Sequence, residues 1–343
     1  MFRNERENGR RGPWHAILLV RLVELQMPNW GVVSEEQLLS ATLQKRLKEH
    51  QVAFPDRQPS LQFPVEACSL AVLALRNHGG PEYTQALRLL LAARNREGSW
   101  PAFGSDDAEG CWATALAVLA LAAAGRSPAD WEPGIQWLLN AKGREAKWFW
   151  RWKFQAVDNS VKFDPAKYGW SWFPGTTSWV IPTAFSLIAL QKVADAVTSL
   201  EPRLSERISL GVAMLRDRMC PGGGWNAGNS AAFGVSYTPY IDATAIALLA
   251  LQRDQEPGVR ASLSWLTALL PDCRSPYSLA WGILGLSPYG RRSNEAGDAI
   301  APAANTLLTA IGTSAATLDT ATIATSALAL EAIGGENVFE VGQ

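Results

Sequence analysis

The sequence has few of the residues that metal and disulfide chemistry require. It contains three histidines, His15, His50 and His78, and four cysteines that lie far apart and form no Cys-x-x-Cys pair. This argues against a zinc site built from clustered Cys and His, and against the cysteine framework of a small secreted protein. We therefore expect a protein of the reducing cytoplasm.

Strong net charge and membrane-length apolar runs are also absent. A formal net charge of -1 argues against a nucleic-acid partner. Residues 1–13 are too charged for a signal peptide, and the apolar run at 14–27 contains Arg21 and Glu24 and is shorter than the roughly 20 residues that span a bilayer. We expect residues 16–25 to form a first packing helix. The alternative is an interfacial anchor, which would make the protein peripherally membrane-associated.

What the sequence does contain is a ten-residue phrase of small and aliphatic residues, repeated six times. The copies end in Ala-Leu or Gly-Leu and align without gaps. They occupy residues 66–75, 112–121, 181–190, 242–251, 277–286 and 321–330. A mean spacing of about fifty residues is right for one helical hairpin per repeat.

The phrase itself predicts a helix that is buried on all sides, because Ala and Leu dominate it and it has no polar face. Amphipathic stretches separate the copies, at residues 82–94, 129–141, 205–219 and 258–270. We therefore predict an all-α protein, an (α/α)6 barrel of six helical-hairpin repeats with a buried inner ring and an amphipathic outer ring. We expect the barrel at 61–335, N-terminal helices and a linker packing on it at 1–60, and a C-terminal tail at 336–343.

Tryptophan is abundant, with 15 residues, and it recurs in glycine-containing loops before inner helices, at residues 98–100, 168–172 and 222–226. Glycine permits a tight reversal with positive φ, and the tryptophan that follows can cover the end of a neighbouring helix. We interpret these loops as a repeated device that fastens the hairpins together. Direct ligand contact is the alternative.

These Gly-Ser-Trp and Gly-Gly-Trp loops, followed by helices such as Thr-Ala-Leu-Ala-Val-Leu-Ala-Leu at 114–121, resemble the prenyltransferase and squalene oxidase repeat. That family includes squalene-hopene cyclases, class II diterpene cyclases and protein prenyltransferase β subunits. The resemblance covers roughly residues 63–335 and is nearest to single-barrel bacterial relatives. It implies an isoprenoid or other lipid in a central apolar cavity. The Gln that usually begins the cyclase loop is Arg94 in the first copy.

In class II cyclases the central Asp of a DxDD motif protonates the substrate. Aligned on Thr244, this chain reads Tyr240-Ile241-Asp242-Ala243, so only the central Asp corresponds. The resemblance therefore implies that Asp242 is the proton donor, and replacement by Asn should abolish turnover. The other interpretation is an aspartate that caps the helix or stabilises its first turn.

The repeat alignment places Glu66 in the same layer as Asp242. The two belong to the first and fourth repeats, which are opposite in a ring of six. We expect Glu66 to be a second acid or base across the mouth. The alternative is that one or both carboxylates point away from the lumen.

Aromatic residues near the same layer are candidates for the cavity wall, where cation–π contact would stabilise carbocations. The candidates are Trp112, Tyr240, Tyr277, Phe185, Trp281 and Trp179. The other interpretation is that these rings are ordinary core.

The remaining chemistries have weaker support. Protein prenyl transfer requires a zinc held by Asp, Cys and His on inner helices, which the positions of the three histidines argue against. We expect no cofactor. The alternative is a Mg²⁺ bound by Asp106 and Asp107, in a loop where polar residues are also the ordinary case.

The sequence thus favours a cyclase-like protein that binds an isoprenoid and starts cyclisation with a proton. One alternative is a non-catalytic isoprenoid-binding or accessory protein. A second is a carbohydrate-active (α/α)6 enzyme, because residues 147–173 form the longest insertion, combine Trp with Asp158 and Asp164, and would suit a lid over one mouth.

Overall fold

The computed structural model describes residues 41, 42, 44, 45, 63–104, 109–156, 163–314 and 317–342. The chain divides into two units, Met1–Ser34 and Glu35–Gln343. All structural statements below concern the described residues of the second unit. The helix expected at residues 16–25, and nearly all of the segment 1–60, lie outside the described residues.

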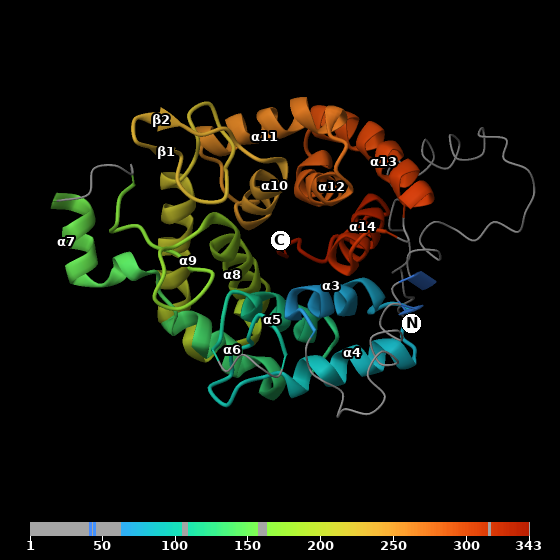
Figure 1. The fold of residues 1–343 in the computed structure, drawn as a ribbon, viewed down its shortest axis with the longest axis horizontal. Helices are drawn as coiled ribbons and strands as arrows, with labels where there is room; N and C mark the ends of the chain where they lie inside the picture. The colour runs from blue at the N-terminus through green and yellow to red at the C-terminus, as the bar shows by residue number, and fades with distance from the viewer. Residues whose placement is uncertain are drawn as a thin grey trace, which may run out of the picture. The chain divides into compact units, whose positions relative to one another are not determined.

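Six inner helices form a closed ring, one on each copy of the repeated phrase (Figure 1). They are α3 (Val65–Leu75), α5 (Ala113–Ala123), α8 (Val180–Val193), α10 (Ile241–Ala250), α12 (Pro276–Gly290) and α14 (Thr320–Ile333). Each packs against the next, and α14 packs against α3. Their residues are buried almost throughout, as the lack of a polar face predicted. The prediction of an all-α (α/α)6 barrel is confirmed.

Outer helices alternate with the inner ones and surround them (Figure 1). The described outer helices are α4 (Pro81–Ala92), α6 (Pro128–Asn140), α9 (Glu201–Asp217), α11 (Pro257–Leu269) and α13 (Asn294–Ser314). The first four match the predicted amphipathic stretches to within a few residues. Each buries one side only; α11, for example, buries Val259, Ser262 and Leu266.

A few shorter elements lie in the connections. These are α7 (Trp148–Ala156), the 3₁₀ turns η1 (Arg144–Ala146), η2 (Ala194–Ala196), η3 (Thr198–Leu200) and η4 (Leu270–Asp272), and a hairpin of β1 (Ala231–Ala232) and β2 (Val235–Ser236). The hairpin strands are antiparallel, with Ala231 opposite Ser236. None of the described helices alone has the length and apolar composition to cross a membrane. One pair, Val180–Ala196 with Thr198–Asp217, meets both criteria together but is bent by 116°.

The tryptophans of the three glycine loops fasten outer helices to the ring. Each indole N–H donates to a carbonyl near the C-terminal end of an outer helix: Trp100 to Leu90 (2.7 Å), Trp170 to Leu138 (2.8 Å) and Trp225 to Leu215 (2.6 Å). The last carbonyls of a helix lack its regular i+4 hydrogen bonds, so the indole N–H supplies a further donor there. All three rings are buried.

A threonine in the first turns of the following inner helix completes each junction. The hydroxyls of Thr114, Thr183 and Thr244 each accept the backbone N–H of the loop tryptophan at 2.9 Å. The same two hydrogen bonds therefore recur in three repeats. The prediction that these loops hold the hairpins together is confirmed.

The C-terminal segment fills the ring instead of extending from it as a tail. The Phe339 side chain is buried against Phe185 and Trp281, at centroid distances of 6.5 and 5.3 Å. The Gln252 side chain donates to the Phe339 carbonyl (3.2 Å) and accepts the N–H of Val341 (3.0 Å). Because Gln252 directly follows α10, the segment closes the end of the ring where the inner helices finish, and Figure 1 shows the C-terminus at the ring centre.

Candidate active site at the barrel mouth

The end of the ring at which the inner helices begin is called the mouth. Backbone hydrogen bonds join neighbouring helix starts there: the Trp112 N–H donates to the Trp172 carbonyl (3.2 Å), and the Val180 N–H donates to the Ala227 carbonyl (3.0 Å). Glu66, Trp112, Asp242 and Tyr277 all lie at helix starts. The repeat register thus brings most of the candidate residues to one end of the barrel.

Glu66, in the first turn of α3, has the most perturbed carboxyl group among the described residues. Its side chain is partly buried and accepts no hydrogen bond from any of them. Burial, and secondarily the negative charge of Asp319, raise its pKa to about 7. Glu66 is therefore about half protonated at neutral pH, so a substantial fraction is in the state that a general acid needs.

Asp319, which the sequence reasoning missed, is the N-cap of α14. Its carboxylate accepts the backbone N–H of Thr322 (2.9 Å) and the Thr322 hydroxyl (2.6 Å). Burial alone would raise the pKa of Asp319, but these hydrogen bonds lower it below its ordinary value. Asp319 is thus a fixed negative charge beside Glu66. The signal was the capping pattern Asp-Thr-Ala-Thr just before the sixth copy of the phrase.

Tyr277, in the first turn of α12, lies close to all three acids. Burial raises its pKa, and the charges of Glu66, Asp242 and Asp319 raise it further. The phenol therefore remains protonated and can donate a hydrogen bond. Three carboxyl groups, at the starts of α3, α10 and α14, therefore act electrostatically on one hydroxyl, and we call these four residues the acidic side of the mouth.

Asp242 does not act as a hydrogen-bonded cap. It lies in the first turn of α10 and is partly buried, the N-cap position belongs to Tyr240, and no described residue donates a hydrogen bond to the Asp242 carboxylate. The positive end of the α10 helix dipole favours the ionised form of a carboxyl group in this first turn. Asp242 is therefore available to a ligand or to a proton.

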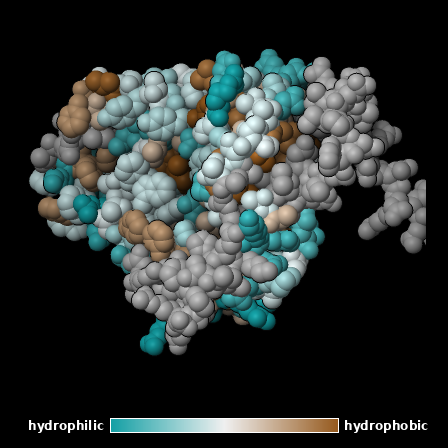
Figure 2. Space-filling view, turned by 45° about the vertical axis from the view of Figure 1, so that its right-hand side comes forward, coloured by the Kyte–Doolittle hydropathy of each residue, from teal (hydrophilic) through white to brown (hydrophobic). Residues whose placement is uncertain are grey.

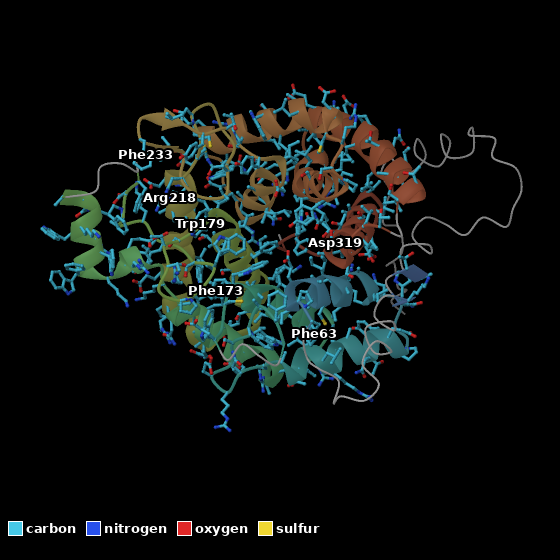
Figure 3. All side chains as sticks on the ribbon, viewed as in Figure 1. Phe63, Phe173, Trp179, Arg218, Phe233 and Asp319 are labelled. Carbon is cyan, nitrogen blue, oxygen red and sulfur yellow. The ribbon has the colours of Figure 1, made fainter. Side chains whose placement is uncertain are left out.

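The opposite side of the mouth is aromatic. The rings of Trp112 and Trp172 meet edge to face at 4.9 Å, and Trp112 lies 6.0 Å from Phe185. Trp179, just before α8, lines an adjoining pocket of about 470 Å³ with Trp172, Phe173, Arg144, Thr176 and Thr177. Figure 3 shows Trp179 on the α8 side of the ring and Asp319 on the α14 side.

Phe185 and Trp281 form a packed floor beneath the mouth. Their exposed fractions are 1% and 0%, and their rings meet at 5.3 Å above Phe339. The Trp281 indole acts as a weak donor toward the Tyr277 oxygen without reaching full hydrogen-bonding geometry. In this structure neither ring presents surface to a ligand, as the core interpretation expects.

Tyr240 lies on the outer rim and is about half exposed. It stands near the β1–β2 hairpin, whose tip carries the exposed Phe233 (Figure 3). The structure therefore separates the predicted aromatic wall into three places: Trp112, Tyr277 and Trp179 at the mouth, Phe185 and Trp281 in the floor, and Tyr240 at the rim.

Asp106, Asp107 and Asp158 lie outside the described residues, and elsewhere no three metal-binding side chains cluster. Burial raises the pKa of Cys68 to about 12, so its thiol remains protonated and unreactive. Asp164 is held in a local contact with Asp217 and Lys167.

No protein-family model and no curated protein matches this sequence. Among solved structures, the chain is similar to Salmonella alpha-2-macroglobulin reacted with methylamine, at 14% identity and a TM-score of 0.43. The match covers 85% of this chain and 17% of that one, so the chain spans about a sixth of the protein it resembles. A likeness at this level says nothing about activity.

Proposed function

We propose that the mouth binds an apolar, unsaturated molecule of the isoprenoid class, and that Glu66 donates the proton that starts its cyclisation. The observation that carries this proposal is the state of Glu66: a partly buried carboxyl group with a pKa of about 7 and no hydrogen bond from the described residues. A perturbed acid in a concave, aromatic setting is a candidate for catalysis on physical grounds.

The surroundings of Glu66 favour a hydrocarbon over a sugar. Across the mouth from the acids lie indole rings, with Trp112 and Trp172 in edge contact. Aromatic faces stabilise cations by about 0.5 to 2 kcal/mol each. This arrangement suits a carbocation better than a carbohydrate.

The proposed reaction is a net isomerisation. Glu66 transfers its proton to a double bond, a carbocation forms, and a second double bond of the same molecule attacks it to close a ring. Proton transfer leaves Glu66 as a carboxylate, and the positive charge of the carbocation stabilises it. The Asp242 carboxylate accepts the proton lost at the end, and water returns the proton to Glu66. Asp319 and Tyr277 position and polarise the acid.

This assignment moves the proton donor from Asp242 to Glu66. The resemblance to class II cyclases implies Asp242 by alignment, whereas burial and Asp319 raise the pKa of Glu66 to about 7, so that much of it is protonated at neutral pH. Both acids act electrostatically on Tyr277, so the proposal keeps both and gives them different roles.

The test is conversion of linear isoprenoids, from farnesyl diphosphate to squalene, by the purified full-length chain, with and without Mg²⁺. Extracts are analysed by mass spectrometry beside Glu66→Gln, Asp242→Asn and the control Glu295→Gln, which changes an exposed acid on α13. The proposal expects a cyclised product from the wild type and the control, and none from Glu66→Gln. Undiminished product from Glu66→Gln would refute the assignment.

A non-catalytic lipid-binding role is the second candidate, and the filled floor favours it. Phe185, Trp281 and Phe339 leave a shallow mouth instead of a deep cavity for a folding polyene. This role predicts a lipid that copurifies and is released on denaturation, and no product in any reaction.

A further inference from the structure

Helix α7 is exposed to an extent unusual for its composition. None of its nine residues is buried, and Trp148, Phe149 and Trp152 expose 80%, 48% and 55% of their surface. It lies outside α9 at the edge of the described unit (Figure 1) and packs mainly against η1. Large exposed aromatic side chains that lie together on one surface mark an interaction site.

The exposed aromatic residues share one face. At 3.6 residues per turn, Trp148, Phe149 and Trp152 fall within an arc about 100° wide, which Arg151 and Lys153 border on its two sides. The other face attaches the helix to the protein, because Trp150 contacts Phe154 at 6.0 Å and Phe154 contacts Phe163 at 5.1 Å. α7 therefore directs its largest apolar side chains away from the barrel.

The charge around this face is of one sign. Residues 142–153 contain five basic side chains, Lys142, Arg144, Lys147, Arg151 and Lys153. The acid among them, Glu145, is fully buried and accepts the N–H of Ser178 at 3.1 and 3.2 Å. The segment thus presents only positive charge to solvent, in a chain whose net charge is -1.

Two of these cations also flank an aromatic ring. Arg144 and Lys153 lie 4.7 and 4.9 Å from the centroid of the Trp150 ring. A cation on an indole keeps its charge near an apolar surface at little cost. Arg144 and Lys153 are therefore held beside α7, next to its exposed aromatic face.

We propose that α7 docks the protein on the surface of an anionic lipid bilayer. Trp148, Phe149 and Trp152 enter the headgroup region, where indole rings are favoured, and the five basic side chains contact lipid phosphates. Acidic headgroups complement this charge. The face shown in Figure 2 carries separate small apolar patches among polar residues. The proposal does not depend on the reaction proposed for the mouth.

The experiment is co-sedimentation of the full-length chain with vesicles of phosphatidylcholine alone, or of phosphatidylcholine with phosphatidylglycerol. We expect binding to the anionic vesicles that weakens as ionic strength rises. Trp148→Ser with Trp152→Ser should reduce the partition coefficient by about tenfold or more, and Lys147→Glu with Lys153→Glu should have an effect at least as large.

The matched control is Phe233→Ser, which removes an aromatic side chain that is 79% exposed on the hairpin tip. It should bind as the wild type does. Since α7 buries no residue, its variants should keep the wild-type circular dichroism spectrum and thermal midpoint. Absence of wild-type binding, equal binding to both vesicle types, or undiminished binding by the Trp148→Ser, Trp152→Ser variant would each overturn the proposal. The last result would direct attention to residues 14–27.

Discussion

The carboxylate of Asp319 lies close enough to Glu66 to raise the pKa of Glu66, although the two residues begin the last and first helices of the ring. Ring closure of α14 against α3 creates this pairing. Hydrogen bonds from Thr322 lower the pKa of Asp319, whereas Glu66 has no such donors among the described residues and its pKa is raised to about 7. The negative charge of Asp319 thus contributes to the raised pKa of Glu66.

Asp319→Asn should lower the pKa of Glu66 from about 7 toward its ordinary value, because it removes the negative charge but keeps an oxygen to cap α14. Burial, the larger cause, would remain, so the decrease should be partial. Titration followed by carbon NMR measures it. The exposed Asp195→Asn, in η2, serves as the control; an unchanged Glu66 pKa in Asp319→Asn would contradict the coupling.

Glu66 should also make stability depend on pH. A carboxyl group whose pKa is raised on folding binds its proton more tightly in the folded state, so its contribution is fully present below pH 4.5 and is lost as pH rises through about 7. Glu66→Gln should therefore be more stable than the wild type at pH 8, by about 1 to 3 kcal/mol. Urea unfolding at pH 4 and pH 8 measures the difference, and a wild type as stable as the variant at pH 8 would refute this sign.

If Glu66 is the proton donor, turnover should fall as pH rises through about 7, since the protonated form is the active one. In Asp319→Asn the fall should begin at lower pH. The measurement is kcat as a function of pH for the wild type and for Asp319→Asn. A shift in the Glu66 pKa would move the pH profile, whereas structural damage would lower kcat at every pH without moving the profile.

Phe339→Ala should destabilise the protein by about 3 to 5 kcal/mol, as for other buried phenylalanines, because it leaves a cavity against Phe185 and Trp281. Phe233→Ala, at an exposed position, should change stability by less than about 0.5 kcal/mol. Urea unfolding compares the two. Equal stability of both variants would show that the C-terminal segment is not part of the folded ring.

Two neighbouring glycines test the packing of the third tryptophan loop. Both have positive φ, but a Cβ on Gly223 would lie 2.7 Å from the backbone nitrogen of Ser262, whereas a Cβ on Gly222 would meet open space. Gly223→Ala should therefore cost about 1 to 3 kcal/mol more than Gly222→Ala. Both variants place an alanine at positive φ, so this cost is removed when the urea midpoints of the two variants are compared. A difference near zero would contradict the close approach of α11 to Gly223.

The ring could be predicted because six copies of one phrase appear at the spacing of helical hairpins. The all-apolar composition of each copy also predicts that its helix is buried. The mouth was only partly predictable. Glu66 and Asp242 lie inside the aligned phrase, whereas Asp319 precedes it and takes its importance from closure of α14 on α3, which composition does not encode. Phe339 gave no periodic signal, since it lies in a short terminal segment and is buried through long-range contacts.

The segment 147–173 shows the same limit. Its density of tryptophan was compatible with a lid or a sugar platform as well as with an ordinary connection packed on the barrel rim, and residues 148–156 form a helix whose aromatic face is exposed. Sequence gives the amphipathic period of such a helix, but not whether its apolar face meets the protein or something else.

The most direct test of this account is the pKa of the Glu66 carboxyl group in the wild-type protein, measured by carbon NMR titration and assigned by the signal missing from Glu66→Gln. The account predicts a value of about 7. A value near the ordinary 4.5 would mean that Glu66 is ionised at neutral pH, and it would remove the proton donor on which the proposed function depends.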